Sequence, residues 1–182
     1  MSKIGVSKFH YAKQTAEDTA SSAATYDTVT AVAGTVSVEV TPSANKSTLY
    51  ADNGPYETAS SLGEINVSLE LADLPISVQA DLLGHTEDSS THQLDYKSSD
   101  VAPYVAIMFE FLLGNGKKRC VKLYKGKFAE PSENGQTKGE NVEFQTSTIE
   151  ASFVQLKNTG LWKSVKDFDA DASTDSWYAS VL

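Results

Sequence analysis

Residues 62–71 read Leu-Gly-Glu-Ile-Asn-Val-Ser-Leu-Glu-Leu, and this stretch decides the fold class. From Glu64 onward, polar and aliphatic side chains alternate without a break. A period of two puts alternate side chains on opposite faces of an extended chain, so the pattern predicts a strand with one buried face. Residues 34–41 repeat it with three valines. The polar faces of the two strands carry Glu39, Glu64 and Glu70.

The segment between these two strands, residues 41–63, has no strong core signal. It contains the turn sequence Asp52-Asn53-Gly54-Pro55, whose residue types favour a tight reversal of the chain. We therefore expect a long hairpin whose tip projects from the body. Candidate contacts between molecules at this tip are Tyr50, Asp52, Asn53, Pro55 and Tyr56.

The hydrophobic period changes over residues 72–84. Asp73 can cap a helix, and Pro75 fits the first turn, where no backbone N–H is needed. Gly84 is a suitable C-terminal stop. One α-helix is predicted over about residues 74–83.

The rest of the chain is mainly β in pattern. Further strands are expected at residues 4–12, 103–113, 119–129, 142–154 (with a bulge near 145–148) and 161–165. Residues 103–113 are apolar on both faces, which indicates a central strand or a contact between subunits. A loop at 13–33 and an acidic C-terminal arm at 167–182 complete one domain spanning residues 1–182.

The composition bounds the function. The chain has 182 residues and a net charge of -9, which disfavours nucleic-acid binding because phosphate contacts need clustered Lys and Arg. An acidic surface can instead repel DNA and let it slide past. A single cysteine excludes an internal disulfide. We find no signal peptide and no apolar run long enough to span a membrane.

The sequence offers no catalytic, cofactor or metal site. His10, His85 and His92 lack the spacing of metal ligands. There is no phosphate loop, dinucleotide fingerprint or nucleophile elbow. Cys120, in a predicted strand, is interpreted as a packing residue. A non-enzymatic protein is therefore expected.

Two groups of residues leave alternatives open. Lys118, Arg119 and Lys122 lie in a basic segment, residues 117–127. It could bind nucleic acid, form a charged edge that discourages wrong strand pairing, or meet an acidic patch on a neighbour. Trp177 and Tyr178 are either docked on their own domain or anchors of a subunit contact.

Five segments, in order, resemble a known family. They are Tyr50-Ala51-Asp52-Asn53-Gly54-Pro55 with Glu57; Ala72-Asp73-Leu74-Pro75 leading into Gln79-Ala80-Asp81-Leu82-Leu83-Gly84; Pro103-Tyr104-Val105-Ala106; Leu123-Tyr124-Lys125-Gly126-Lys127-Phe128 with Glu130-Pro131-Ser132; and Glu143-Phe144-Gln145-Thr146. Together they resemble phage major tail proteins of the phi13-type family, from siphophages of Gram-positive hosts. The resemblance covers roughly residues 1–168.

The resemblance implies a tail-tube fold, a β-sandwich or rolled barrel with a flanking helix. It implies hexameric rings, stacked around a tape-measure protein and completed by tail-terminator and distal tail proteins. The protein would be made in the host cytoplasm, reside in the virion tail, and let DNA pass without specific binding. In such a tube the hairpin at residues 41–63 is the natural element to reach the next ring, and the N-terminal loop and the C-terminal arm are further candidates. As a hypothesis from the strand pattern, Glu39, Glu64 and Glu70 face the lumen.

Two other functions remain as alternatives. A carbohydrate- or receptor-binding module of the tail tip or baseplate would expose an aromatic platform, and none is evident. A small β-rich hydrolase would need a catalytic constellation that the sequence lacks. Assembly into rings or tubes, seen by electron microscopy, separates the structural function from both.

Overall fold

The computed structural model describes residues 2–88, 90–133, 135–137 and 145–182. Strands dominate it. Most of them form one large antiparallel sheet that does not close into a barrel, and two short strands form a separate small sheet. The elements are β1 (Lys3–Ala16), β2 (Thr25–Tyr26), β3 (Thr30–Val32), β4 (Thr35–Ala51), β5 (Gly54–Leu71), α1 (Ile76–Leu83), β6 (Thr86–Asp88), β7 (Gln93–Asp95), β8 (Val105–Leu113), β9 (Lys118–Phe128), β10 (Ser147–Val154), β11 (Lys163–Phe168) and α2 (Asp175–Tyr178). The mainly β fold class predicted from the sequence is confirmed.

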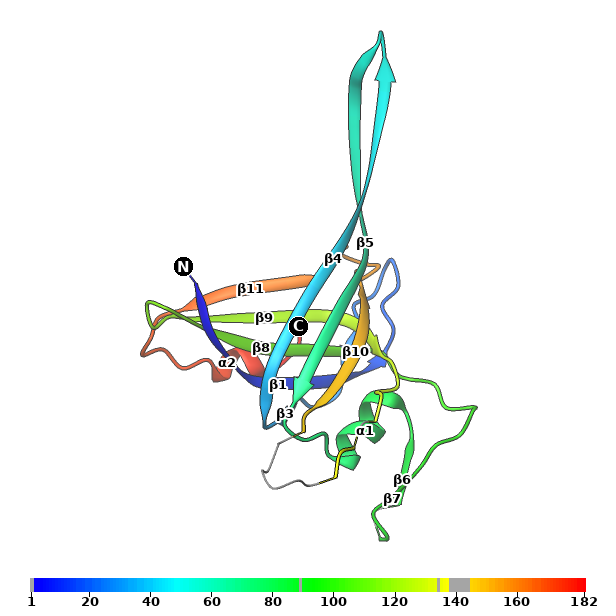
Figure 1. Ribbon diagram of the computed structural model, residues 1–182, viewed down its shortest axis with the longest axis vertical. Helices are drawn as coiled ribbons and strands as arrows, with labels where there is room; N and C mark the ends of the chain where they lie inside the picture. Colours follow the sequence, from blue (N-terminus) through cyan, green and yellow to red (C-terminus); the bar gives the residue numbers. More distant parts are fainter. Residues whose placement is uncertain (1, 89, 134, 138–144) are drawn as a thin grey trace.

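The sheet folds over itself into two crossed layers (Figure 1). We call β4, β5 and β10 the hairpin layer, and β1, β8, β9 and β11 the β8–β9 layer. Strand β9 belongs to both. Its first part pairs with β8 and β11, and its end pairs with β10. The short strand β3 pairs with β1 of the β8–β9 layer and is followed by β4 of the hairpin layer. It therefore connects the two layers at the edge opposite β9.

Gly126 lies where β9 passes from one layer to the other. A Cβ atom at this position would lie 2.5 Å from the Phe153 ring, which is fully buried. Glycine is therefore required by close packing, because any side chain would overlap the ring.

Replacing Gly126 by alanine is expected to lower the free energy of unfolding by about 1–3 kcal/mol, the usual cost of overpacking a core. Urea titration followed by tryptophan fluorescence measures it. Gly135→Ala is the matched control, because a Cβ there would meet nothing within 4 Å. Equal stability of the two variants would contradict this account of Gly126.

The main core lies between the two layers. The alternation at residues 62–71 places Ile65, Val67, Leu69 and Leu71 in it, as the sequence predicts. The β8–β9 layer contributes its inner face, and helix α1 closes one end with Leu82 and Leu83. The layer is also apolar on its outer face, where Ala12, Ala106, Met108 and Tyr124 form a second cluster.

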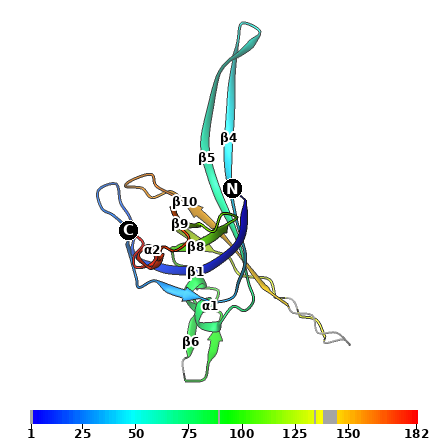
Figure 2. The same ribbon diagram turned by 90° about the vertical axis from the view of Figure 1, so that its left-hand side faces the viewer.

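The β4–β5 ladder continues far past the body. Paired residues run from Thr35–Leu71 to Ala51–Gly54, and both views show the hairpin projecting beyond the layers (Figures 1 and 2). The reversal uses Asp52 and Asn53, at φ 50° and 64°. Two central residues with positive φ suit the right-handed twist of paired strands.

Several boundaries differ from those expected. The helix begins at Ile76, after Pro75 rather than with a capping Asp73. The predicted loop 13–33 is partly strand, because β1 runs to Ala16 and pairs with β2 and β3. The last strand lies at 163–168 instead of 161–165. Val142 and Phe144, expected to begin a strand, lie outside the described residues, and β10 begins at Ser147.

Candidate functional site

The hairpin tip carries the most exposed aromatic side chains of the described residues. Tyr50 is 72% exposed and Tyr56 is 73% exposed. Tyr50 is paired with Pro55 across the ladder, and Asp52 and Asn53 form the turn. All five residues that the sequence nominated for this tip therefore lie together at the end of one two-stranded ribbon.

The acidic residues Glu39, Glu64 and Glu70 lie on the outward face of the hairpin layer. Strand register fixes this face, because Glu39 is paired with Ser68, and Ser68 with Glu150 of β10. Lys127 of β9 joins the same face through its pairing with Ser152. The sequence did not single out Glu150, and it placed Lys127 only in the basic segment 117–127. Only the register brings the two residues beside Glu39.

Glu70 is fixed in place on this face. Its carboxylate accepts hydrogen bonds from Thr146 Oγ1 at 2.6 Å and Ser37 Oγ at 2.9 Å. These bonds hold the pKa of Glu70 below its usual value, so it is charged at neutral pH. The same face holds an open groove of about 580 Å³. Glu39, Lys127 and Glu150 are among the residues that line it.

The basic segment is neutralised by the chain's own C-terminal arm. Arg119 donates two hydrogen bonds to Asp167, each 2.7 Å, and Lys117 pairs with Asp169 at 2.8 Å. Lys118 Nζ donates to the backbone oxygen of Ala172. Of the three interpretations of this segment, the geometry thus favours contact with an acidic patch, but the patch lies on the same chain.

Lys122 is buried rather than exposed. Its Nζ donates to the backbone oxygens of Ser180 at 2.6 Å and Val181 at 3.3 Å, and it lies 4.6 Å from the centre of the Trp177 ring. Burial lowers the pKa of Lys122. This lysine therefore holds the end of the chain against β9 and is not free to meet another molecule.

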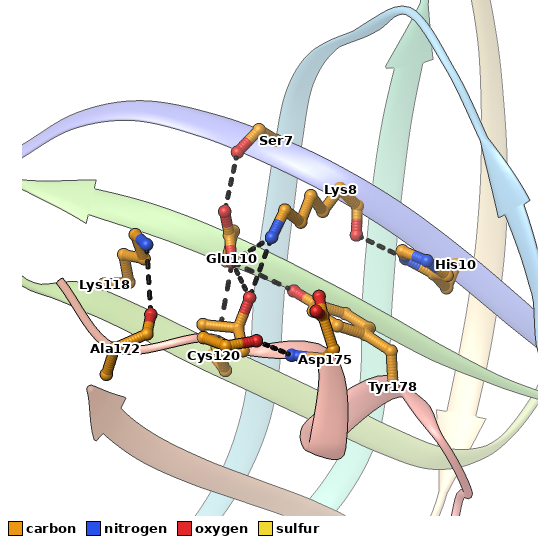
Figure 3. Close-up of polar contacts among 11 residues, drawn as sticks. Ser7, Lys8, His10, Glu110, Lys118, Cys120, Ala172, Asp175 and Tyr178 are labelled. Carbon is orange, nitrogen blue, oxygen red and sulfur yellow. Dashed lines mark hydrogen bonds and ion pairs between the residues drawn. The ribbon is translucent and has the colours of Figure 1, made fainter. Parts of the chain in front are cut away.

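A buried carboxylate, Glu110, anchors the arm from the other side (Figure 3). Thr174 Oγ1 donates to Glu110 Oε2 at 3.0 Å and accepts from Lys8 Nζ at 2.9 Å. Ser7 Oγ donates to Glu110 Oε1 at 3.3 Å, and the Tyr178 hydroxyl donates to Oε2 at 3.5 Å. The cluster joins β1, β8 and the arm.

Tyr178 and Trp177 are docked on their own domain. The Tyr178 ring stacks on His10, with centroids 4.2 Å apart, and Tyr178 is buried with Val181 in the second apolar cluster. Trp177 packs edge-on against Phe168. The arm is thus a cover for the outer face of the β8–β9 layer (Figure 2).

A buried ion pair fixes the N-terminal loop. Lys125 and Asp18 have side chains 2% and 0% exposed, and their Nζ and Oδ1 atoms are 2.6 Å apart. Burial alone would raise the pKa of Asp18, but hydrogen bonds from Lys125 and from the Lys157 backbone N–H lower it. The pair is internal and structural.

The described residues offer little for catalysis. No group of three or more His, Cys, Asp or Glu among them is placed to hold a metal ion. Burial beside Glu110 raises the pKa of the Cys120 thiol to about 11, so the nucleophilic thiolate is scarce at neutral pH. Nor is any helix in the described ranges long and apolar enough to cross a membrane.

Comparison with known proteins adds an independent line of evidence. The family model described as phage tail tube protein matches residues 13–178. No curated protein gives a significant match. The matched range includes the hairpin, helix α1, the docked helix α2 and both sheet layers, except for residues 3–12 of β1.

Proposed function

Because the chain belongs to the phage tail tube protein family, a structural component of the virion tail, we propose that it self-assembles into stacked hexameric rings. Their common bore conducts DNA during infection. The observation that carries this proposal is the hairpin, which places exposed aromatic side chains well outside the body that anchors it.

The hairpin supplies the contact between successive rings. Beyond Pro42 its side chains are largely exposed, so they cover little of the rest of the described chain. At a rise of about 3.4 Å per residue, the nine residues from Ser43 to Ala51 reach roughly 30 Å. Tyr50 and Tyr56 at its end are residue types favoured in the cores of protein interfaces.

A second contact surface joins neighbours within a ring. The hairpin layer crosses only part of the β8–β9 layer, so one end of the latter is uncovered (Figure 1). Val36 of β4 and Val165 of β11 are 46% and 49% exposed. Strand β4 ends the strand order, and within the described residues its second edge pairs with no strand. A neighbour would cover the valines and complete this edge.

The outward face of the hairpin layer lines the bore. It carries Glu39, Glu64, Glu70 and Glu150 against Lys127. A surplus of carboxylates repels phosphate groups at short range, so DNA passes without adhering. Before DNA enters, the same bore encloses a tape-measure protein, and tail-terminator and distal tail proteins complete the two ends. The subunits are made in the host cytoplasm.

Electron microscopy of the concentrated protein tests the assembly. We expect six-fold rings or tubes with a central channel. A protein that stays monomeric at high concentration, across a range of salt and pH, would refute it. Glycan binding by such a monomer would favour a receptor-binding module instead.

Reversing charge on the outward face is expected to make tubes retain DNA. Glu39→Lys and Glu150→Lys change two exposed side chains that lie beside Ser68, so folding and assembly are expected to persist. Co-sedimentation of labelled DNA with tubes should rise steeply at low salt and fall as salt increases. Asp171→Lys, at an exposed position of the C-terminal arm, is the control. Equal DNA retention in all variants would exclude this face from the bore.

A further inference from the structure

The end of the molecule opposite the hairpin gathers a second set of exposed apolar side chains. Helix α1 and the β6–β7 extension lie at this end in both views (Figures 1 and 2). Ile76 is 42% exposed, Tyr96 is 53% exposed and Val101 is 71% exposed. We call these three residues, together with His85, the foot surface.

The foot surface is built tightly onto the end of α1. Gly84 ends the helix at φ 78°, and a Cβ there would lie 2.4 Å from the backbone oxygen of Val101. The Tyr96 hydroxyl donates to Gln79 Oε1 at 3.0 Å. Residues 96–101 therefore pack directly against helix α1. They contact it away from the face that is buried in the main core.

His85 joins three segments at this point. Its Nδ1 lies 2.8 Å from Asp100 Oδ2, and its Nε2 lies 2.7 Å from Glu130 Oε1. The His85 side chain is 4% exposed, and the Tyr96 ring lies over it with centroids 4.2 Å apart. The residue thus links the helix end to the loop at 96–104 and to the segment that follows β9.

Only the protonated form of His85 satisfies both contacts. A neutral imidazole donates from one ring nitrogen and would turn the lone pair of the other toward a carboxylate, which also only accepts. Burial alone would lower the pKa of His85, but the hydrogen bonds and charges of Asp100 and Glu130 raise it. Around this pair, Lys97 lies beside Asp100, and Glu133 lies near the Tyr96 hydroxyl.

We infer that the foot surface receives the hairpin tip of a second copy in the next ring, and that the proton on His85 holds it in the receiving shape. This inference rests on the proposed stacking of rings. The tip carries the exposed apolar residues Leu49, Tyr50 and Tyr56. The hairpin lies at the other end of the long axis from helix α1 (Figure 1). Contact between unlike ends of identical subunits generates an open stack.

Charge is mainly acidic on both sides of this contact, and protonation of His85 lowers the resulting repulsion without removing it. The tip carries Asp52 and Glu57, and the foot carries Asp100 and Glu130. An imidazolium between the two foot carboxylates reduces the repulsion that the tip would meet. Loss of the proton therefore weakens the contact in two ways, by loosening the loop at 96–104 and by restoring like charge.

The sign of the pH dependence follows from linkage. A histidine whose folded pKa is raised contributes stability that is fully present below its unfolded pKa, near 6.5. That contribution is lost as pH rises through the folded pKa. Order at the foot surface and tube assembly should both decline as pH rises through the folded pKa of His85, which lies above its usual value.

The first measurement uses the monomer and needs no assembly. Imidazole resonances are followed by NMR from pH 5 to pH 10, with the exposed His92 in the same spectrum for comparison. We expect His85 to titrate above 6.5, and amide protection of residues 85–88 and 90–101 to fall through the same range. In Glu130→Gln the midpoint should move down by about one pH unit, the usual effect of removing a paired charge. A His85 midpoint at or below 6.5 would refute the proposed role of the His85 proton in holding the foot surface.

The second measurement uses assembly. Val101→Ser changes an exposed side chain, and we expect about a tenfold higher critical concentration for tubes, the usual effect of one buried aliphatic contact. Leu182→Ser, at an exposed site on the C-terminal arm, is the control. Glu130→Gln should move the alkaline loss of tubes to lower pH.

The outcomes separate the two proposals. If the unaltered protein forms no tubes at any pH, the tail-tube assembly itself fails. If tubes form but Val101→Ser assembles as well as Leu182→Ser, the foot surface is not the receiving site. If Val101→Ser impairs assembly but the Glu130→Gln pH profile is unchanged, the role of the His85 proton is refuted.

Discussion

Shortening the β4–β5 hairpin is expected to abolish tube formation while leaving the monomer folded. The strands can be cut without disturbing the body, because Asn45 is paired with Ser61. Residues 46–60 are replaced by Asn-Gly, a two-residue turn suited to this position. The removed side chains are almost all exposed, so little core packing is lost.

The thermal midpoint of the shortened monomer should stay within a few degrees of the parent value, since exposed residues contribute little to stability. Tube formation, followed by sedimentation and electron microscopy, should disappear even at a hundredfold higher concentration, the usual range for losing an aromatic hot spot. Normal tubes from this variant would exclude the hairpin as the contact between rings.

A matched pair of variants locates the effect within the hairpin. Tyr50→Ser with Tyr56→Ser removes the two exposed rings, and Thr48→Ser with Thr58→Ser changes a cross-strand pair two residues further back. We expect the tyrosine variant to assemble poorly and the threonine variant to assemble normally. Equal defects would mean that the length of the ribbon matters and its tip does not.

The second large effect is expected at Glu110. Glu110→Ala removes the acceptor shared by Ser7, Thr174 and Tyr178, and leaves Lys8 without its carboxylate partner. Breaking a buried charged cluster costs about 3–5 kcal/mol. For a chain of this size that corresponds to a loss of roughly 6–20 °C in thermal midpoint.

The loss should release the C-terminal arm before the rest of the fold. Limited proteolysis should cut within residues 169–182 in Glu110→Ala under conditions that leave the parent intact, and amides near Tyr178 should lose protection. Glu110→Gln, which keeps an acceptor, should lie between the two. Glu150→Ala, on the exposed outward face, is the control. An arm that stays protected in Glu110→Ala would show that Lys122 and the apolar cluster hold it alone.

Elements defined by local pattern could be predicted from the sequence. The alternation at residues 62–71 correctly predicted which face of the strand is buried. The sequence Asp52-Asn53 correctly predicted where the hairpin reverses. Gly84 marked the helix end, whose left-handed backbone favours glycine. Each signal is local, because the period of the strand or the φ requirement of one residue determines it.

The polar clusters could not be predicted in this way. Glu110 is separated by 64 residues from Thr174 and by 103 from Ser7, so only the fold makes them neighbours. Lys122 and Lys125 look solvent-exposed in a basic segment, yet both are buried by long-range partners. His85 lacks metal-ligand spacing, and its two carboxylates come from separate loops. The sequence did carry one sign of the contact between the C-terminal arm and β9. The acidic run at 167–175 is opposite in charge to the basic segment 117–127.

The narrow two-stranded ribbon also bears on the mechanics of a tube. A ribbon joined only along its own ladder flexes and twists more readily than a sheet packed on both faces. If consecutive rings are linked by such ribbons, curvature of the tail is absorbed in the gaps between rings. Each ring then keeps a constant cross-section, and the channel stays open while the filament bends.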